Sequence, residues 1–151
     1  MIRPTNIYLS YAHADHRRAD AIIAALKALL PGIGPHGAEV WHGGEIKGGA
    51  IWTLEVDAAI RRSDIFVILL SNDYLASPYT AEVELAFILC EQRDRGGLVI
   101  PVITRATDLG MLERFQTIDA RNRSAQWIAT KLADAVMTYS ASEAGSLVAH
   151  A

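Results

Sequence analysis

The chain has 151 residues, of which 51% are hydrophobic and 21% charged, and its formal net charge is −3. This length and composition predict one compact domain that can bury a core. The slight negative charge and the lack of any basic run argue against nucleic-acid and anionic-membrane contacts. No apolar stretch is long enough to span a bilayer, and Cys90 is the single cysteine. We therefore expect a cytoplasmic protein without an internal disulfide.

The first half of the chain alternates short apolar strands with helical patterns. Helical spacing of apolar residues begins near Asp15, and Pro31-Gly32 stops it. In chain order, the predicted elements are a strand at 7–9, a helix at 15–30, a weak strand at 39–41, a glycine-rich loop at 42–49 and a helix at 50–62.

The second half opens on the apolar run Ile65 to Leu70, which does not alternate and so suits a strand buried on both faces of a parallel sheet. Ser77-Pro78 then predicts a helix start, with Ser77 as the cap and Pro78 at the first helical position. The remaining predicted elements are a helix at 78–93, a strand at 98–103 whose Pro101 indicates an incompletely paired edge, an irregular segment at 107–115, a short strand at 117–118 and a final helix ending at Tyr139.

The tail from Ser140, SASEAGSLVAHA, is small and polar enough to be a linker or a frayed end. We therefore divide the chain into a domain at 1–139 and a tail at 140–151. Five strand–helix units in succession predict an α/β fold, a doubly wound five-stranded parallel sheet.

Ligands of such sheets bind beyond the carboxyl ends of the strands, so the helix that carries Glu82 and Glu84 lies where chemistry is expected. Both glutamates fall at the borders of the apolar stripe of that helix, on opposite flanks. Periodicity therefore does not choose between them. That stripe consists of Ala81, Leu85, Ile88 and Leu89.

Four segments in this order resemble a TIR domain of the bacterial type: IYLSYAHAD, VWHGGEIKGGAIW, SDIFVILLSNDYLASPYTAEVELA and FQTIDAR. The resemblance runs from about residue 6 to residue 139. It implies a flavodoxin-like sheet with helices on both faces and, in many members, NAD cleavage that depends on one glutamate of the third helix. The family pattern of an aromatic and a small residue before that glutamate lies best on Tyr79-Thr80 and Glu84. Glu84 is therefore the predicted catalytic residue.

Cleavage of the bond between nicotinamide and ribose passes through an oxocarbenium-like state, and the leaving group departs neutral, so a single carboxylate suffices. The resemblance implies NAD+ as substrate, with no cofactor and no metal. Two functions stay open. One is an NAD+ glycohydrolase with a linear or cyclic product, acting as an assembly-activated effector in bacterial anti-phage immunity. The other is a non-catalytic TIR–TIR interaction module.

The resemblance also implies that the 42–49 loop borders the pocket and contacts a neighbouring copy, and a sensor domain or partner chain is expected to supply the trigger. Gly43 stands where relatives commonly carry an acidic residue, so contacts assigned to that acid do not transfer. Trp52 lies on an apolar helical face, which favours a core position. The predicted substrate-binding residues are Ser10, Tyr11, Ala12, Trp41, Gly43, Gly44, Trp52, Ser71 and Tyr79.

A cluster of metal-ligand types near the first helix is interpreted as solvated. His13, Asp15 and His16 lie at a loop and a helix start, where such residues seldom bind metal without a second ligand cluster. The first strand ends in Ser10-Tyr11 without an acidic pair, which argues against a magnesium-binding receiver domain.

Overall fold

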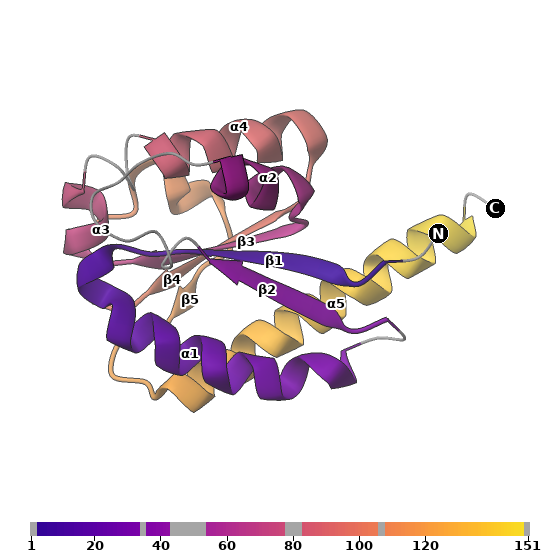
Figure 1. Ribbon diagram of the computed structural model, residues 1–151, viewed down its shortest axis with the longest axis horizontal. Helices are drawn as coiled ribbons and strands as arrows, with labels where there is room; N and C mark the ends of the chain where they lie inside the picture. The colour runs from indigo at the N-terminus through magenta and orange to yellow at the C-terminus, as the bar shows by residue number, and fades with distance from the viewer. Residues whose placement is uncertain (1–2, 34–35, 43–53, 78–82, 106–107, 150–151) are drawn as a thin grey trace.

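The computed structural model places a five-stranded sheet between two layers of helices (Figure 1). The structure describes residues 3–33, 36–42, 54–77, 83–105 and 108–149. Among these residues, no helix has both the length and the apolar character needed to cross a membrane.

All pairings in the sheet are parallel, and the strand order is β2-β1-β3-β4-β5. The predicted doubly wound five-stranded sheet is therefore confirmed. Every residue of the central strand β3 is buried, which explains why its sequence is a continuous apolar run. The strands are β1 (Thr5–Ser10), β2 (Ala38–His42), β3 (Ile65–Leu70), β4 (Leu98–Ile103) and β5 (Ile118–Asp119).

Helices cover both faces of the sheet. Figure 1 shows α1 and α5 on one face and α2 and α4 on the other. The α-helices are α1 (His16–Leu29), α2 (Leu54–Arg62), α3 (Asn72–Ala76), α4 (Leu85–Arg95) and α5 (Ala125–Ala149). The 3-10 helices are η1 (His13–Asp15), η2 (Leu30–Gly32) and η5 (Gly110–Arg114).

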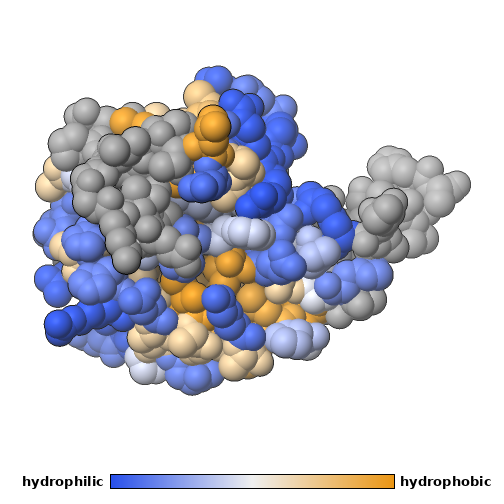
Figure 2. Space-filling model, viewed as in Figure 1, coloured by the Kyte–Doolittle hydropathy of each residue, from blue (hydrophilic) through white to orange (hydrophobic). Residues whose placement is uncertain are grey.

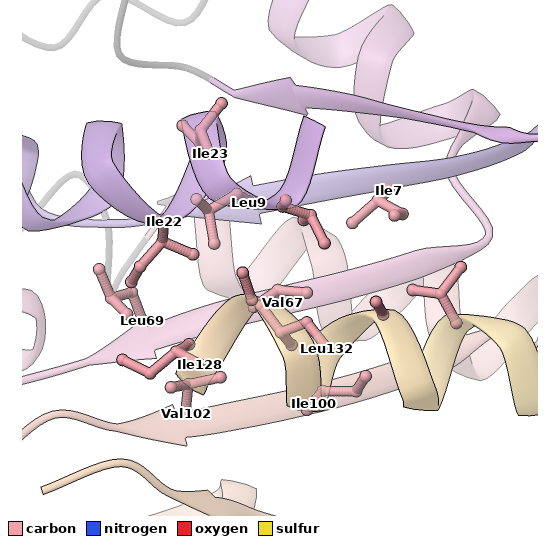
Figure 3. Packing of buried hydrophobic residues seen from close by; sticks show 14 of the residues in the cluster. Ile7, Leu9, Ile22, Ile23, Val67, Leu69, Ile100, Val102, Ile128 and Leu132 are labelled. Atoms are coloured by element: carbon pink, nitrogen blue, oxygen red, sulfur yellow. The ribbon is translucent and has the colours of Figure 1, made fainter. Parts of the chain in front are cut away.

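The residues that Figure 3 labels in the core on the α1 and α5 face are all aliphatic. Alternate residues of β1, β3 and β4 point toward the two helices, because successive strand side chains face opposite sides of a sheet. Burying each such side chain contributes about 1.5–3 kcal/mol to folding. The labelled members are Ile7, Leu9, Ile22, Ile23, Val67, Leu69, Ile100, Val102, Ile128 and Leu132.

The short helix α3 (Asn72–Ala76) corrects the sequence analysis, which assigned no element there. Five residues are too few to show a helical period, so no periodic pattern in the sequence indicates this helix. Ser71 caps it, since the Ser71 Oγ accepts a hydrogen bond from the Tyr74 N–H at 3.1 Å. The predicted helix start at Pro78 lies outside the described residues, and the Ser77 N–H donates to the Tyr74 carbonyl at the end of α3.

Pro101 lies inside β4, next to the short edge strand β5. β4 pairs with β3 along its whole length. The described pairs between β4 and β5 are Val102 with Ile118 and Ile103 with Asp119, and Pro101 is in neither. The proline has no N–H to donate, and this is tolerated because the described pairs with β5 begin only after it, at Val102.

The last helix continues beyond the domain boundary drawn from the sequence. α5 runs from Ala125 to Ala149, so the segment from Ser140 is helical where a linker-like or frayed tail was expected. Figure 1 shows this end of α5 projecting away from the sheet.

A substitution at Gly97 tests the turn between α4 and β4. Gly97 has a φ of +110°, and a Cβ at this position would lie 2.8 Å from the Asp64 carbonyl oxygen. Gly97→Ala should therefore lower the free energy of unfolding by about 2 kcal/mol or more, measured by urea denaturation.

Gly32→Ala is the matched control, because no atom lies within 4 Å of the added Cβ there. Its unfolding free energy should change by less than about 0.5 kcal/mol. Equal losses in the two variants would contradict the steric explanation.

Candidate functional site

Glu84 is a buried carboxylate at the start of α4. It is 3% exposed and lies one helical turn before the fully buried Ile88. Val83 and Glu84 have π-helical hydrogen bonding, a wider turn that is frequent at functional sites. The helical wheel places Glu84 at the border of the apolar stripe, and the structure shows that the side chain is buried. Glu82 lies outside the described residues, and the choice of Glu84 as the catalytic residue stays a prediction.

Ser10 and Tyr74 meet in the interior next to this carboxylate. Ser10 ends β1, Tyr74 lies in α3, and their hydroxyl oxygens are 2.8 Å apart. Both residues are 0% exposed. Tyr74 and Glu84 also interact electrostatically. The contact between Ser10 and Tyr74 joins residues that lie 64 positions apart in the chain.

Burial raises the pKa of the Tyr74 phenol well above its usual range, and the charge of Glu84 adds to this effect, while the hydrogen bond with Ser10 opposes it. Tyr74 therefore stays protonated under ordinary conditions. A neutral phenol can donate a hydrogen bond, which a carboxylate can only accept.

Ser71 links the end of β3 to the loop after β1. Its Oγ donates a hydrogen bond to the Asp15 carboxylate at 2.5 Å and accepts one from the Tyr74 N–H at 3.1 Å. Asp15 was expected to be solvated, and this contact corrects that expectation. His13 and His16 are exposed, with ring centroids 5.2 Å apart. Over the described ranges, no three His, Cys, Asp or Glu side chains converge on one point.

The strand order places these residues at the point where the connections diverge. β1 is followed by a connection to β2 on one side, and β3 by a connection to β4 on the other. Ligands of such sheets bind at this switch point, beyond the carboxyl ends of the strands. Ser10 closes β1 and Ser71 follows β3, so the two serines flank it. Thr104, after β4, donates through its N–H and its Oγ1 to the Leu70 carbonyl at 3.1 and 2.9 Å.

The other predicted residues at the end of β1 face β2 or the core. The Tyr11 hydroxyl lies 3.3 Å from the Nδ1 of His42, the last residue of β2, and the two rings are tilted. Ala12 is buried. Tyr11 therefore ties the two strand ends together at the start of the 42–49 loop, and a role in substrate binding stays a prediction for both residues.

Trp41 lies at the open edge of the sheet. It is 36% exposed, and the Arg62 guanidinium stacks 3.8 Å from its ring centroid. With Lys27, Leu30 and Val40 it lines a hollow of about 540 Å³. Figure 2 shows apolar side chains gathered in this area, between β2 and α1. Glu84 is not among the residues that line this hollow, and the predicted contact of Trp41 with substrate stays a prediction.

Four predicted binding residues lie outside the described residues: Gly43, Gly44, Trp52 and Tyr79. Sequence reasoning missed two residues that are bonded to Ser10 or Ser71, the partly exposed Asp15 and the buried Tyr74. For Tyr74 a signal was present, because a serine directly after a strand with an aromatic residue three positions later fits an N-cap and its first turn. The contact of Asp15 spans 56 positions and left no signal in the local pattern.

Comparison with known proteins identifies relatives of this chain. A family model described as "TIR domain" matches residues 7–137. The Uncharacterized protein y4lF of Sinorhizobium fredii (strain NBRC 101917 / NGR234) is 31% identical over 104 residues, which are 68% of this chain. The match covers 31% of the length of that relative.

Removal of the Ser71 hydroxyl tests the link between β3, α3 and η1. Ser71→Ala deletes both the cap of α3 and the hydrogen bond to Asp15, so the free energy of unfolding should fall by about 1–3 kcal/mol in urea denaturation. Asp15→Asn keeps an acceptor oxygen for Ser71 and should cost less than Asp15→Ala. If the two Asp15 variants were equally stable, the hydrogen bond to Ser71 would contribute nothing.

Proposed function

Because the chain belongs to the TIR domain family, we propose that it is an NAD+ glycohydrolase with Glu84 as its catalytic carboxylate. The family includes NAD-cleaving enzymes. The observation that carries the proposal is the 3% exposure of Glu84 next to the Ser10–Tyr74 pair. An ionised carboxylate is costly to bury, and a protein that needed only a helix surface there would leave it in water.

The proposed reaction begins with breakage of the bond between C1′ of the ribose and the nicotinamide nitrogen. The bonding electron pair moves onto the pyridinium ring, which departs as neutral nicotinamide without a proton donor. The Glu84 carboxylate stabilises the positive charge that develops on the ribose. Water then attacks C1′ and loses one proton to Glu84 or to solvent. Attack by an adenine nitrogen in place of water gives the cyclic product.

The surroundings of Glu84 strengthen this electrostatic effect. A charge acts more strongly where water is excluded, because the effective dielectric constant is lower. NAD+ is the substrate, and we propose that no separate cofactor is used. Ser10 and Ser71 are proposed to border the ribose at the switch point, and the 42–49 loop is proposed to border the same pocket.

TIR domains in general self-associate. We propose that contact between copies through the 42–49 loop activates this chain, as an effector in bacterial anti-phage immunity. This biological setting rests on the family alone. The relative from Sinorhizobium fredii carries further sequence outside the aligned 104 residues, and a sensor domain or partner chain for this chain is likewise a proposal.

Glu84→Gln tests the proposed chemistry. The amide keeps the shape of the side chain and removes its charge, so NAD+ cleavage should fall about a thousandfold or more. Nicotinamide release is measured by chromatography, and circular dichroism verifies that the variant is folded. Glu82→Gln is the matched control and should retain most of the activity.

The reverse result, with an inactive Glu82→Gln and an active Glu84→Gln, would assign catalysis to Glu82. A wild-type protein that assembles and releases no nicotinamide would instead favour the non-catalytic interaction module.

The proposed activation by assembly makes activity depend on protein concentration. If a neighbouring copy completes the site, nicotinamide release per molecule should rise across about a thousandfold range of concentration, in step with association. Sedimentation velocity on the same samples measures the association. Constant activity per molecule in a strictly monomeric sample would refute this mode of activation.

A further inference from the structure

Two hydroxyl groups are buried together at a place where a pair of apolar side chains would cost less free energy to bury. The Ser10 Oγ and the Tyr74 Oη are 2.8 Å apart, and both residues are 0% exposed. A buried hydroxyl costs free energy unless it is hydrogen-bonded. Alanine in place of Ser10 and phenylalanine in place of Tyr74 would avoid this cost. Stability alone therefore does not explain the pair.

The hydrogen atoms of the pair point to a further partner. Each hydroxyl carries one hydrogen, and the bond between the two oxygens uses only one of the two. If Ser10 donates to Tyr74, the phenol hydrogen is directed to a second acceptor. Glu84 is buried, its chain neighbour Leu85 belongs with Tyr74 to one cluster of packed buried residues, and its carboxylate accepts only. Its charge also acts on the phenol, which burial keeps protonated.

We propose that Tyr74, oriented by Ser10, is a positioning residue whose hydroxyl holds the Glu84 carboxylate in place near the carboxyl ends of β1 and β3. The contact itself is independent of the reaction. Its consequence for catalysis rests on the proposed NAD+ glycohydrolase function. A carboxylate held in place stabilises a developing charge without having to reorient as the reaction proceeds.

The fold holds this pair through both partners. The Tyr74 N–H is bonded to the Ser71 cap of α3, and Ser10 lies within the parallel ladder between β1 and β3. Tyr74 is thus held through its backbone at the end of β3 and through its phenol at the end of β1. These two strands end at the same edge of the sheet. A misplaced carboxylate lowers the rate of the chemical step more than it weakens substrate binding.

Steady-state kinetics of assembled protein test the catalytic consequence. Tyr74→Phe should lower kcat for NAD+ cleavage about 10- to 100-fold and change KM by less than about threefold. Ser10→Ala should lower kcat by less, and the double variant should lose less than the product of the two single effects, because Ser10 orients Glu84 through Tyr74. Tyr139→Phe, on the opposite face of the sheet, is the matched control with unchanged kcat.

Thermal unfolding tests the contact without any activity. Tyr74→Phe should lower the melting temperature by about 2–6 °C in the wild-type background and by about half as much or less in Glu84→Gln, whose neutral amide is a weaker acceptor. Tyr139→Phe should shift the melting temperature equally in both backgrounds.

Each outcome decides one of the two proposals. A raised KM with unchanged kcat, or normal kinetics in folded Tyr74→Phe, would overturn the positioning role. If the assembled wild type does not cleave NAD+, the proposed function fails and the melting temperatures alone decide. Unequal shifts for Tyr74→Phe then support the contact with Glu84, and equal shifts overturn it.

Discussion

The parallel pairing of β1 with β3 is the interaction on which the candidate site depends. It sets Ser10 opposite Ile68 and brings the carboxyl ends of two strands together that lie more than 50 residues apart in the chain. Because β2 lies on the far side of β1, the chain leaves these two ends in opposite directions. The divergence opens the edge of the sheet, and the loop after β1 and the helix α3 after β3 both border it.

Polar groups at this edge are buried in a way that a purely structural site would avoid. Ser10, Tyr74 and Glu84 are each 3% exposed or less, although every such group costs free energy unless it is hydrogen-bonded. Ser71 and Asp15 extend the cluster toward the surface through one short hydrogen bond. Charged and polar groups that are fixed in a poorly hydrated place suit the stabilisation of a developing charge. This is the physical link between the fold and the proposed NAD+ cleavage.

The two faces of the sheet differ in the side chains that they bury. The face under α1 and α5 holds an aliphatic core that spans β1, β3 and β4 (Figure 3). The other face includes Tyr8 and Tyr74 and carries the buried carboxylate. The apolar side chains buried on the first face contribute stability, and this stability offsets the free-energy cost of the polar groups buried on the second. Functional sites in proteins commonly carry such a cost, which is compensated elsewhere in the fold.

The sequence by itself determined the order and type of the main elements, because strand and helix periods are local properties of the chain. The unbroken apolar run of β3 predicted a central strand, and the helical spacing from Asp15 predicted α1. Only the tertiary structure decided that Glu84 is buried, since it lies at the π-helical start of α4 and interacts electrostatically with Tyr74 of α3. The same holds for the Ser10–Tyr74 contact, which spans 64 positions and depends on the pairing of β1 with β3, and no local pattern records either.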